Sequence, residues 1–257
     1  MSLRQFPTSR IVGAYRLTSN RQWHYAERFA IAAIEYCCYS VFRKFGAPVW
    51  PMLVMDCSTR TGGTPPDRHP PNSHNNGVNL DLGYYGLLDL RPSLVPGPHN
   101  TRRMTGPPDP RKFAAAAEVE WFLAMGRLEV DIGGVLVNLC ATDPFIERHL
   151  DPKIQLADAA PSVKEEALRI CFSSGTGGWQ DFHHHHRHVR FHRMQNGDEL
   201  ADYIERTWVQ PLLQIRPTPV LANDEEDEVI DEPQYLTAEL RIYEEVKATQ
   251  EKRKKQR

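Results

Sequence analysis

The spacing of apolar and polar residues predicts a chain that alternates between helices and strands. Apolar side chains recur every three to four residues over 22–45, which predicts a long amphipathic helix ended by Gly46 and Pro48. Over 78–84 apolar residues instead alternate with polar ones, which predicts a strand. That alternation places Asp81 on the polar face of the strand.

The same periodicities assign the rest of the chain. Further strands are predicted at 50–56, 130–139 and 182–191. Further helices are predicted at 110–125, 143–150, 161–171 and 198–213. Gly133 and Gly134 indicate a bulge in the strand that contains them or a close approach of another part of the chain. This mixture of elements indicates an α+β fold.

The composition allows one substantial folded body. The chain has 257 residues, of which 40% are hydrophobic, and a formal net charge of −2, so nucleic acid is not the expected partner. After residue 218 the composition changes to an acidic segment followed by a charged, helix-prone end. We therefore predict a domain over 1–218 and, over 219–257, an acidic linker with a charged helical tail.

Neither the cysteines nor the apolar segments indicate export or a membrane. The five cysteines form no C-x-x-C motif, so we expect reduced and mostly buried thiols. The first residues lack the apolar core of a signal peptide, and the most apolar stretch, 29–41, is too short to span a bilayer. These features predict synthesis in the cytoplasm without a signal peptide, and no membrane anchor.

Two segments carry candidate metal chemistry. In the first, a loop rich in proline and glycine leads into His74, and Gly77 permits a tight turn before Asp81 on the predicted strand. In the second, His186 and His188 lie two residues apart, so a strand would present both imidazoles on one face. Two imidazoles and one carboxylate can hold zinc and leave one position open, as in a hydrolase.

The histidine run at 183–186 has a second interpretation. A low-complexity tract of histidines binds metals loosely without any specific site, and the run alone does not distinguish the two cases. Its occurrence together with the segment from His74 to Asp81 favours a mononuclear zinc site. Three arginines, Arg60, Arg68 and Arg190, are candidates to pair with substrate carboxylates, although arginines are commonly ordinary surface residues.

These residues resemble the LAS zinc peptidases, and within that group the penicillin-insensitive murein endopeptidases. The likeness is carried by His74-x-x-Gly77-x-x-x-Asp81 and by the later His183-x-x-His186-x-His188-Val189-Arg190. Weaker support comes from Asp56-Cys57-Ser58 followed by Gly62-Gly63, from Ser73 before His74, and from Asp81-Leu82-Gly83-Tyr84-Tyr85. The family's enzymes are commonly exported and disulfide-bonded, and neither sign is present in this sequence.

The resemblance implies a small antiparallel sheet that carries a zinc site and is flanked by helices. It implies that His74, Asp81 and His188 bind the zinc, and that His186 lies beside the bound water as general base or transition-state stabiliser. His183 would be a further active-site imidazole, a role that His184 or His185 can also fill because the run permits slippage. His69 corresponds to a family histidine that precedes the first ligand, at a wider spacing than expected.

The activity implied by the resemblance is zinc-dependent hydrolysis of peptidoglycan cross-links of the D-alanyl–diaminopimelate type. Without a signal peptide, such an enzyme would reach the periplasm or the cell wall as a phage lysis enzyme or an injected antibacterial effector, with a delivery or immunity protein as partner. Two alternatives stay open: a carboxypeptidase or dipeptidase on the same scaffold, and a hedgehog-like module that binds zinc without catalysis.

Overall fold

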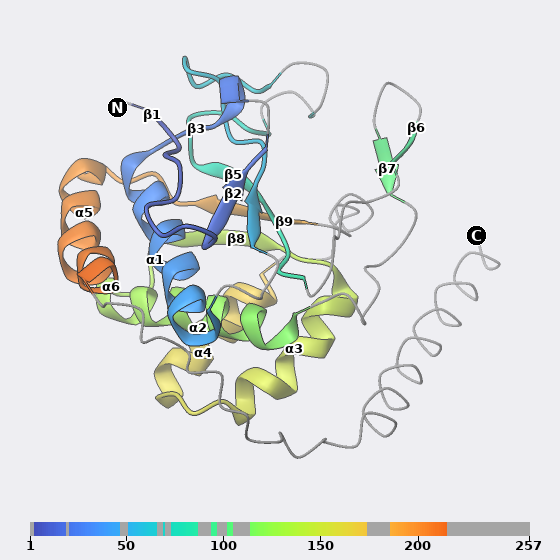
Figure 1. Cartoon of the computed structure of the whole chain (residues 1–257), viewed down its shortest axis with the longest axis vertical. Helices are drawn as coiled ribbons and strands as arrows, with labels where there is room; N and C mark the ends of the chain where they lie inside the picture. The colour runs from blue at the N-terminus through green and yellow to red at the C-terminus, as the bar shows by residue number, and fades with distance from the viewer. Residues whose placement is uncertain are drawn as a thin grey trace. The chain divides into compact units, whose positions relative to one another are not determined.

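The core of the structure, a computed structural model, is a five-stranded sheet with the order β2-β4-β5-β9-β8 (Figure 1). Its strands are β2 (Tyr15–Leu17), β4 (Met52–Val54), β5 (Asn79–Gly83), β8 (Val137–Ala141) and β9 (His186–Phe191). β2 and β4 pair in parallel, and all other neighbours pair antiparallel. Two small antiparallel pairs join β1 (Arg4–Gln5) to β3 (Tyr25–Ala26) and β6 (Leu94–Pro96) to β7 (Arg102–Met104).

The structure describes residues 3–18, 21–46, 51–65, 69, 73–86, 94–96, 102–104, 114–173 and 186–214. Its helices are η1 (Arg21–Trp23), α1 (Arg28–Phe45), α2 (Ala115–Ile132), α3 (Pro144–Leu156), α4 (Pro161–Cys171), α5 (Gly197–Ile204), the π-helical turn η5 (Glu205–Val209) and α6 (Gln210–Gln214). The fold is therefore α+β, as the sequence predicted. The predicted boundary at residue 218 and the tail over 219–257 lie outside the described residues.

One face of the sheet packs against helices. Leu80 and Leu82 of β5 pair in register with Val189 and Arg187 of β9, and all four side chains are fully buried. Phe191 of β9 meets Phe29 of α1 edge to face, with ring centroids 5.9 Å apart. Because side chains alternate along a strand, the residues between these positions point to the opposite face.

Arg187 is the only charged member of this helix-covered face of β9. Its guanidinium forms a fully buried ion pair with Glu118 of α2 and lies 4.2 Å from the ring centroid of Trp121. The other carboxylate oxygen of Glu118 accepts the backbone N–H of Tyr85 at 2.5 Å. The pair thus connects β9, α2 and the end of β5 through the apolar core.

The predicted helix over 22–45 begins too early. The segment before Arg28 instead forms η1 and β3, because the N–H and C=O groups of Tyr25 bond to Ser58 in an isolated bridge. The amide of Glu27 then donates to the carbonyl oxygen of Gly77 at 2.9 Å. These long-range bonds compete with the helical ones, and periodicity alone does not reveal them.

The predicted strand at 130–139 is also wrong in position. Helix α2 continues to Ile132, and Gly133 ends it with a positive φ of 86°, so the glycine pair caps a helix. The buried carboxylate of Glu129 accepts the backbone amides of Leu136 and Val137. The irregularity in the ladder between β8 and β9 lies instead between Val137 and Leu139.

Two predictions about burial and membranes can be compared with the described residues. All five cysteines are buried and none forms a disulfide. Across the described ranges, no helix combines the length and apolar character that crossing a bilayer requires.

Candidate metal centre

The antiparallel pairing of β5 with β9 brings the two candidate segments together. In register, Asp81 lies opposite His188 and Gly83 lies opposite His186. Alternation along both strands therefore places one carboxylate and two imidazoles on the face of the sheet that is turned away from α1 and α2. Residues more than a hundred positions apart in sequence become neighbours through this single ladder.

A tight turn before β5 positions His74. Asn76 and Gly77 both adopt left-handed backbone conformations, with φ values of 62° and 69°. A Cβ atom on Gly77 would lie 2.3 Å from Leu3 and 2.9 Å from the backbone nitrogen of Glu27, so this position requires glycine. The turn predicted at Gly77 is confirmed, and it directs His74 back over the strand that carries Asp81.

Three imidazole nitrogens converge on one oxygen of Asp81. Measured to Asp81 Oδ1, the distances are 2.8 Å from His188 Nδ1, 3.4 Å from His74 Nε2 and 3.6 Å from His186 Nε2. The site is enclosed, since Asp81 is 4% exposed and His74 is 2% exposed. A buried carboxylate surrounded by nitrogen donors is a suitable environment for a cation.

A hydrogen bond to the ring nitrogen that is not directed at Asp81 fixes the orientation of His74. Its Nδ1–H donates to the carbonyl oxygen of Cys57 at 3.1 Å. The neutral tautomer with a proton on Nδ1 therefore presents the lone pair of Nε2 to Asp81. Metal-binding histidines usually donate their second nitrogen to a carbonyl or carboxylate in this way.

The ring of His188 is held in a corresponding manner by Asn79. The Asn79 amide nitrogen donates to the Asn75 carbonyl, and its Oδ1 accepts Arg190 Nε at 2.9 Å. Because Oδ1 is an acceptor only, His188 Nε2 must donate to it across their separation of 3.1 Å. The Nδ1 atom of His188 is then the nitrogen directed at Asp81.

These two ring orientations require positive charge at the centre. Without a proton or a metal between them, the lone pairs of His74 Nε2 and His188 Nδ1 would face the same carboxylate oxygen and repel it. Burial raises the pKa of Asp81, but the charges of His74 and His186 outweigh burial and hold that pKa well below its usual range. Burial lowers the pKa of His74, and Asp81 more than reverses this, so the net pKa is raised.

His69 and Asp56 form a hydrogen-bonded pair beside the cluster of His74, Asp81, His186 and His188. His69 Nε2 donates to Asp56 Oδ2 at 2.9 Å and lies 3.9 Å from Asp81 Oδ2. The rings of His69 and His74 lie with centroids 3.9 Å apart. His69, His74 and Asp81 each offer a ligand atom within 4.8 Å of the others, so this group of described residues is spaced to hold a metal ion, with His69 in place of the predicted His188.

The structure brings together most of the residues that the sequence singled out. His74, Asp81, His186 and His188 share one enclosed cluster, and His69 joins them. The candidates His183, His184, His185 and Arg68 lie outside the described residues. Arg60 is exposed, and Arg190 belongs to the network behind His188.

Two polar residues of the cluster were given no role from the sequence. Asp56 follows β4, and its carbonyl oxygen accepts the backbone N–H of Asp81 at 2.9 Å, which places its carboxylate beside the site. Asn79 shares the polar face of β5 with Asp81, and this alternation was the available signal for it. The hydrogen-bond partners of Asp56 and Asn79 depend on which strands pair and in which register, and the sequence alone does not give this.

Comparisons with known proteins add no relative. No protein-family model, no curated protein and no solved structure matches this chain. The resemblance to the LAS peptidases therefore stays a prediction, carried by the residues of the two segments.

Proposed function

We propose that this chain is a zinc-dependent amide hydrolase of the LAS type that cleaves peptide cross-links of peptidoglycan. One observation carries the proposal: imidazoles of His74, His186 and His188 converge on a single oxygen of the buried Asp81. The metal-dependent hydrolysis rests on this geometry. The peptidoglycan substrate and the LAS fold rest on the sequence resemblance.

The donor set fits zinc. His74 and His188 each direct one ring nitrogen at Asp81 while the other nitrogen is engaged by Cys57 or Asn79. Two imidazoles and a carboxylate are a common zinc ligand set that leaves a fourth position open. Zinc held by His74, Asp81 and His188 would supply a Lewis acid that polarises a carbonyl and acidifies water.

The remaining side chains suit proton handling. His186 Nε2 faces the same oxygen as the proposed ligands, at 3.6 Å, so it is placed to accept a proton at the attack and return it to the departing amine. Asp56 holds His69 beside the cluster by a hydrogen bond from Nε2. An imidazole N–H at this place can stabilise negative charge developing on the carbonyl oxygen.

Delivery remains part of the proposal. We infer that a phage lysis enzyme or an injected effector is the form in which such a hydrolase would reach the periplasm or cell wall, with a delivery or immunity protein as partner. Residues 219–257 would serve delivery. A chain that lacks residues 223–257 is then expected to digest murein at the full rate in vitro, and a large loss of that activity would refute this division.

The first test combines metal content with murein digestion. The purified chain is expected to hold one zinc and to release cross-linked muropeptides as products that mass spectrometry identifies. His186→Ala should retain zinc and lose about a hundredfold or more of the turnover, since general base catalysis contributes about that much. His74→Ala should lose the zinc itself, and zinc retained by His74→Ala would contradict the ligand assignment.

A non-catalytic zinc-binding module is the second candidate, favoured by the additional imidazoles. If His69 occupies the fourth position, as its place among the ligand atoms permits, the site is closed like a structural one. Absence of turnover on murein, together with zinc that is lost on His69→Ala, would favour the module. Release of terminal residues alone would instead indicate a carboxypeptidase or dipeptidase.

A further inference from the structure

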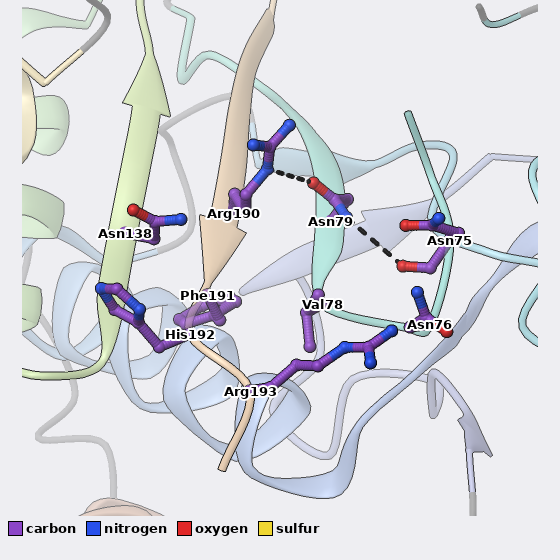
Figure 2. A pocket seen from close by; sticks show the side chains of 9 residues that line it. All are labelled: Asn75, Asn76, Val78, Asn79, Asn138, Arg190, Phe191, His192 and Arg193. Carbon is purple, nitrogen blue, oxygen red and sulfur yellow. Dashed lines mark hydrogen bonds between the residues drawn. The ribbon is translucent and has the colours of Figure 1, made fainter. Parts of the chain in front are cut away.

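A polar pocket lies beside the metal cluster, where Asn79 of β5 and Arg190 of β9 are two residues along their strands from Asp81 and His188. Figure 2 shows the side chains that line it. Its volume is about 390 Å³. It is lined by asparagine, arginine and histidine side chains with few apolar ones: Asn75, Asn76, Val78, Asn79, Asn138, Arg190, Phe191, His192 and Arg193. Asn79 lies opposite Arg190 in the ladder, as Asp81 lies opposite His188.

Two guanidiniums give the pocket an excess of positive charge. Arg190 uses Nε to bond Asn79, and Figure 2 shows its terminal nitrogens directed away from that bond. Arg193 extends toward Asn76 from the other side of the pocket. Among the described residues, neither arginine forms an ion pair with a carboxylate. The charge of the buried Glu27 carboxylate interacts with that of Arg193 electrostatically.

The chemistry of the lining suits a carboxylate attached to a peptide. An arginine fork matches the two oxygens of a carboxylate, and charge-assisted hydrogen bonds are the stronger ones. The neighbouring asparagine amides each offer a donor and an acceptor, which match the N–H and C=O of a peptide group. A fully charged phosphate would use the donors only.

The side chain of Asn79 connects the pocket to the metal cluster by hydrogen bonds. Asn79 accepts hydrogen bonds from both Arg190 and His188, so a single side chain borders the pocket and orients a proposed ligand. Two residues along a strand correspond to roughly 7 Å. An extended peptide with a carboxylate in the pocket would therefore present an amide about two residues away at the cluster.

We propose that this pocket is the substrate subsite of the hydrolase, and that Arg190 and Arg193 in it bind a carboxylate about two residues from the scissile amide. The inference rests on the proposed function for its reaction but makes a separate claim about binding. It assigns specificity to acidic peptides, and it gives Arg190 a role as a substrate-binding residue.

Binding can be measured without turnover. On the His186→Ala background, two fluorescein-labelled pentapeptides that differ only by one glutamate or glutamine are titrated at low salt and followed by anisotropy. The glutamate peptide is expected to bind about tenfold more tightly, the value of one charge-assisted hydrogen bond. Added NaCl should reduce this preference, because the pocket is open to solvent.

Variants show which residues cause the preference for the glutamate peptide. Arg190→Gln and Arg193→Gln should each remove most of it, whereas Arg148→Gln, which changes an exposed arginine on α3, should leave it unchanged. Circular dichroism establishes that each variant is folded. If both pocket variants fail to fold, the comparison of the two peptides on the intact pocket still decides.

The outcomes separate this inference from the proposed function. Equal affinity for the two peptides, no measurable binding of either, or a preference that survives in folded Arg190→Gln and Arg193→Gln would overturn the subsite. A clear preference together with no zinc and no hydrolysis by the wild-type chain would confirm that the pocket binds carboxylates and would overturn the hydrolase.

Discussion

Asn79 shows how much of the candidate metal centre is decided by a residue that would not touch the metal. It donates to Asn75 and accepts from both Arg190 and His188, which leaves one orientation for its amide and one donor role for His188 Nε2. Spacing and strand alternation predicted which strand faces carry Asp81, His186 and His188, and the resemblance implied that His74, Asp81 and His188 meet. The roles of Asn79 and Asp56 were not, because both depend on which strands lie side by side.

Removing the Asn79 amide should weaken the metal site without abolishing it. Asn79→Ala is expected to lower zinc affinity about 10- to 100-fold, the usual effect of losing a partner behind a ligand. Asn138→Ala is the matched control, because Asn138 lines the same pocket and is exposed. Competition with a zinc chelator measures both, and equal affinities in the two variants would remove Asn79 from the site.

Zinc affinity should fall as the pH is lowered. Burial lowers the pKa of His74, but Asp81 more than reverses this, so protons compete with the metal from a higher pH than at an isolated histidine. The metal-free chain should show the opposite dependence. Its His74–Asp81 contribution to stability is present below the unfolded pKa of histidine and is lost as the pH rises through the raised value.

Thermal unfolding with and without zinc, over a range of pH, tests the predicted pH dependence of zinc affinity and that of the stability of the metal-free chain. The zinc-induced rise in Tm should grow with pH in the wild-type chain. In His74→Gln the rise should be small at every pH. A zinc-induced rise that is independent of pH in the wild-type chain would contradict the ligand role of His74.

Among the elements, α2 and α4 make an unusually close helix contact. A Cβ atom on Gly126 of α2 would lie 2.5 Å from the carbonyl oxygen of Val163 and 3.1 Å from the backbone nitrogen of Ala167. Both neighbours are backbone atoms of α4, so they cannot move aside by a change of rotamer. The sequence showed a glycine within an apolar helix, but its reason appears only when the second helix is in place.

Gly126→Ala should therefore destabilise the fold even though alanine favours helices. Helix propensity would contribute about 1 kcal/mol in favour of the variant, and overpacking is expected to cost about 1–3 kcal/mol. Val130→Ala, at an exposed position of the same helix, should change stability by less than about 0.5 kcal/mol. Urea unfolding measures both, and a stabilised Gly126→Ala would show that the helices can separate.

Element boundaries show where sequence patterns stop being sufficient. The strand with Asp81 and the helix Pro161–Cys171 were predicted closely, because alternation or periodicity persists to their ends. The start of α1 and the position of β8 were not. Before α1, the backbone of Tyr25 bonds to that of Ser58, which lies far away in the sequence. Before β8, the carboxylate of Glu129 accepts the amides of Leu136 and Val137. These contacts of the folded chain set the element boundaries, and periodicity does not reveal them.

For the whole molecule, two histidines outside the cluster should set the response to acid. Burial is the first cause that lowers the pKa of His24 and of His149 from 6.5 to about 4, and positive neighbours add to it. Both rings are neutral in the folded state at pH 6, whereas they take up protons when the chain unfolds. Their contribution to stability is therefore present above pH 6.5 and is lost as the pH falls towards 4.

Comparison with variants isolates this effect from the opposite slope of His74. The free energy of unfolding of the wild-type chain is measured by urea between neutral pH and pH 4, beside His149→Gln. The difference between the two should shrink or change sign as the pH falls, because glutamine takes up no proton. A difference that does not vary with pH would contradict the buried, neutral state of His149.

Arg187 has a consequence for the alignment of β9 as a whole. The strand presents imidazoles to the cluster on one side and this guanidinium to Glu118 and Trp121 on the other. A slide by a single position would separate the guanidinium from Glu118, leave that carboxylate buried without its partner, and place an imidazole inside the apolar core. The pairing of Arg187 with Glu118 therefore selects which histidines of β9 face Asp81, namely His186 and His188.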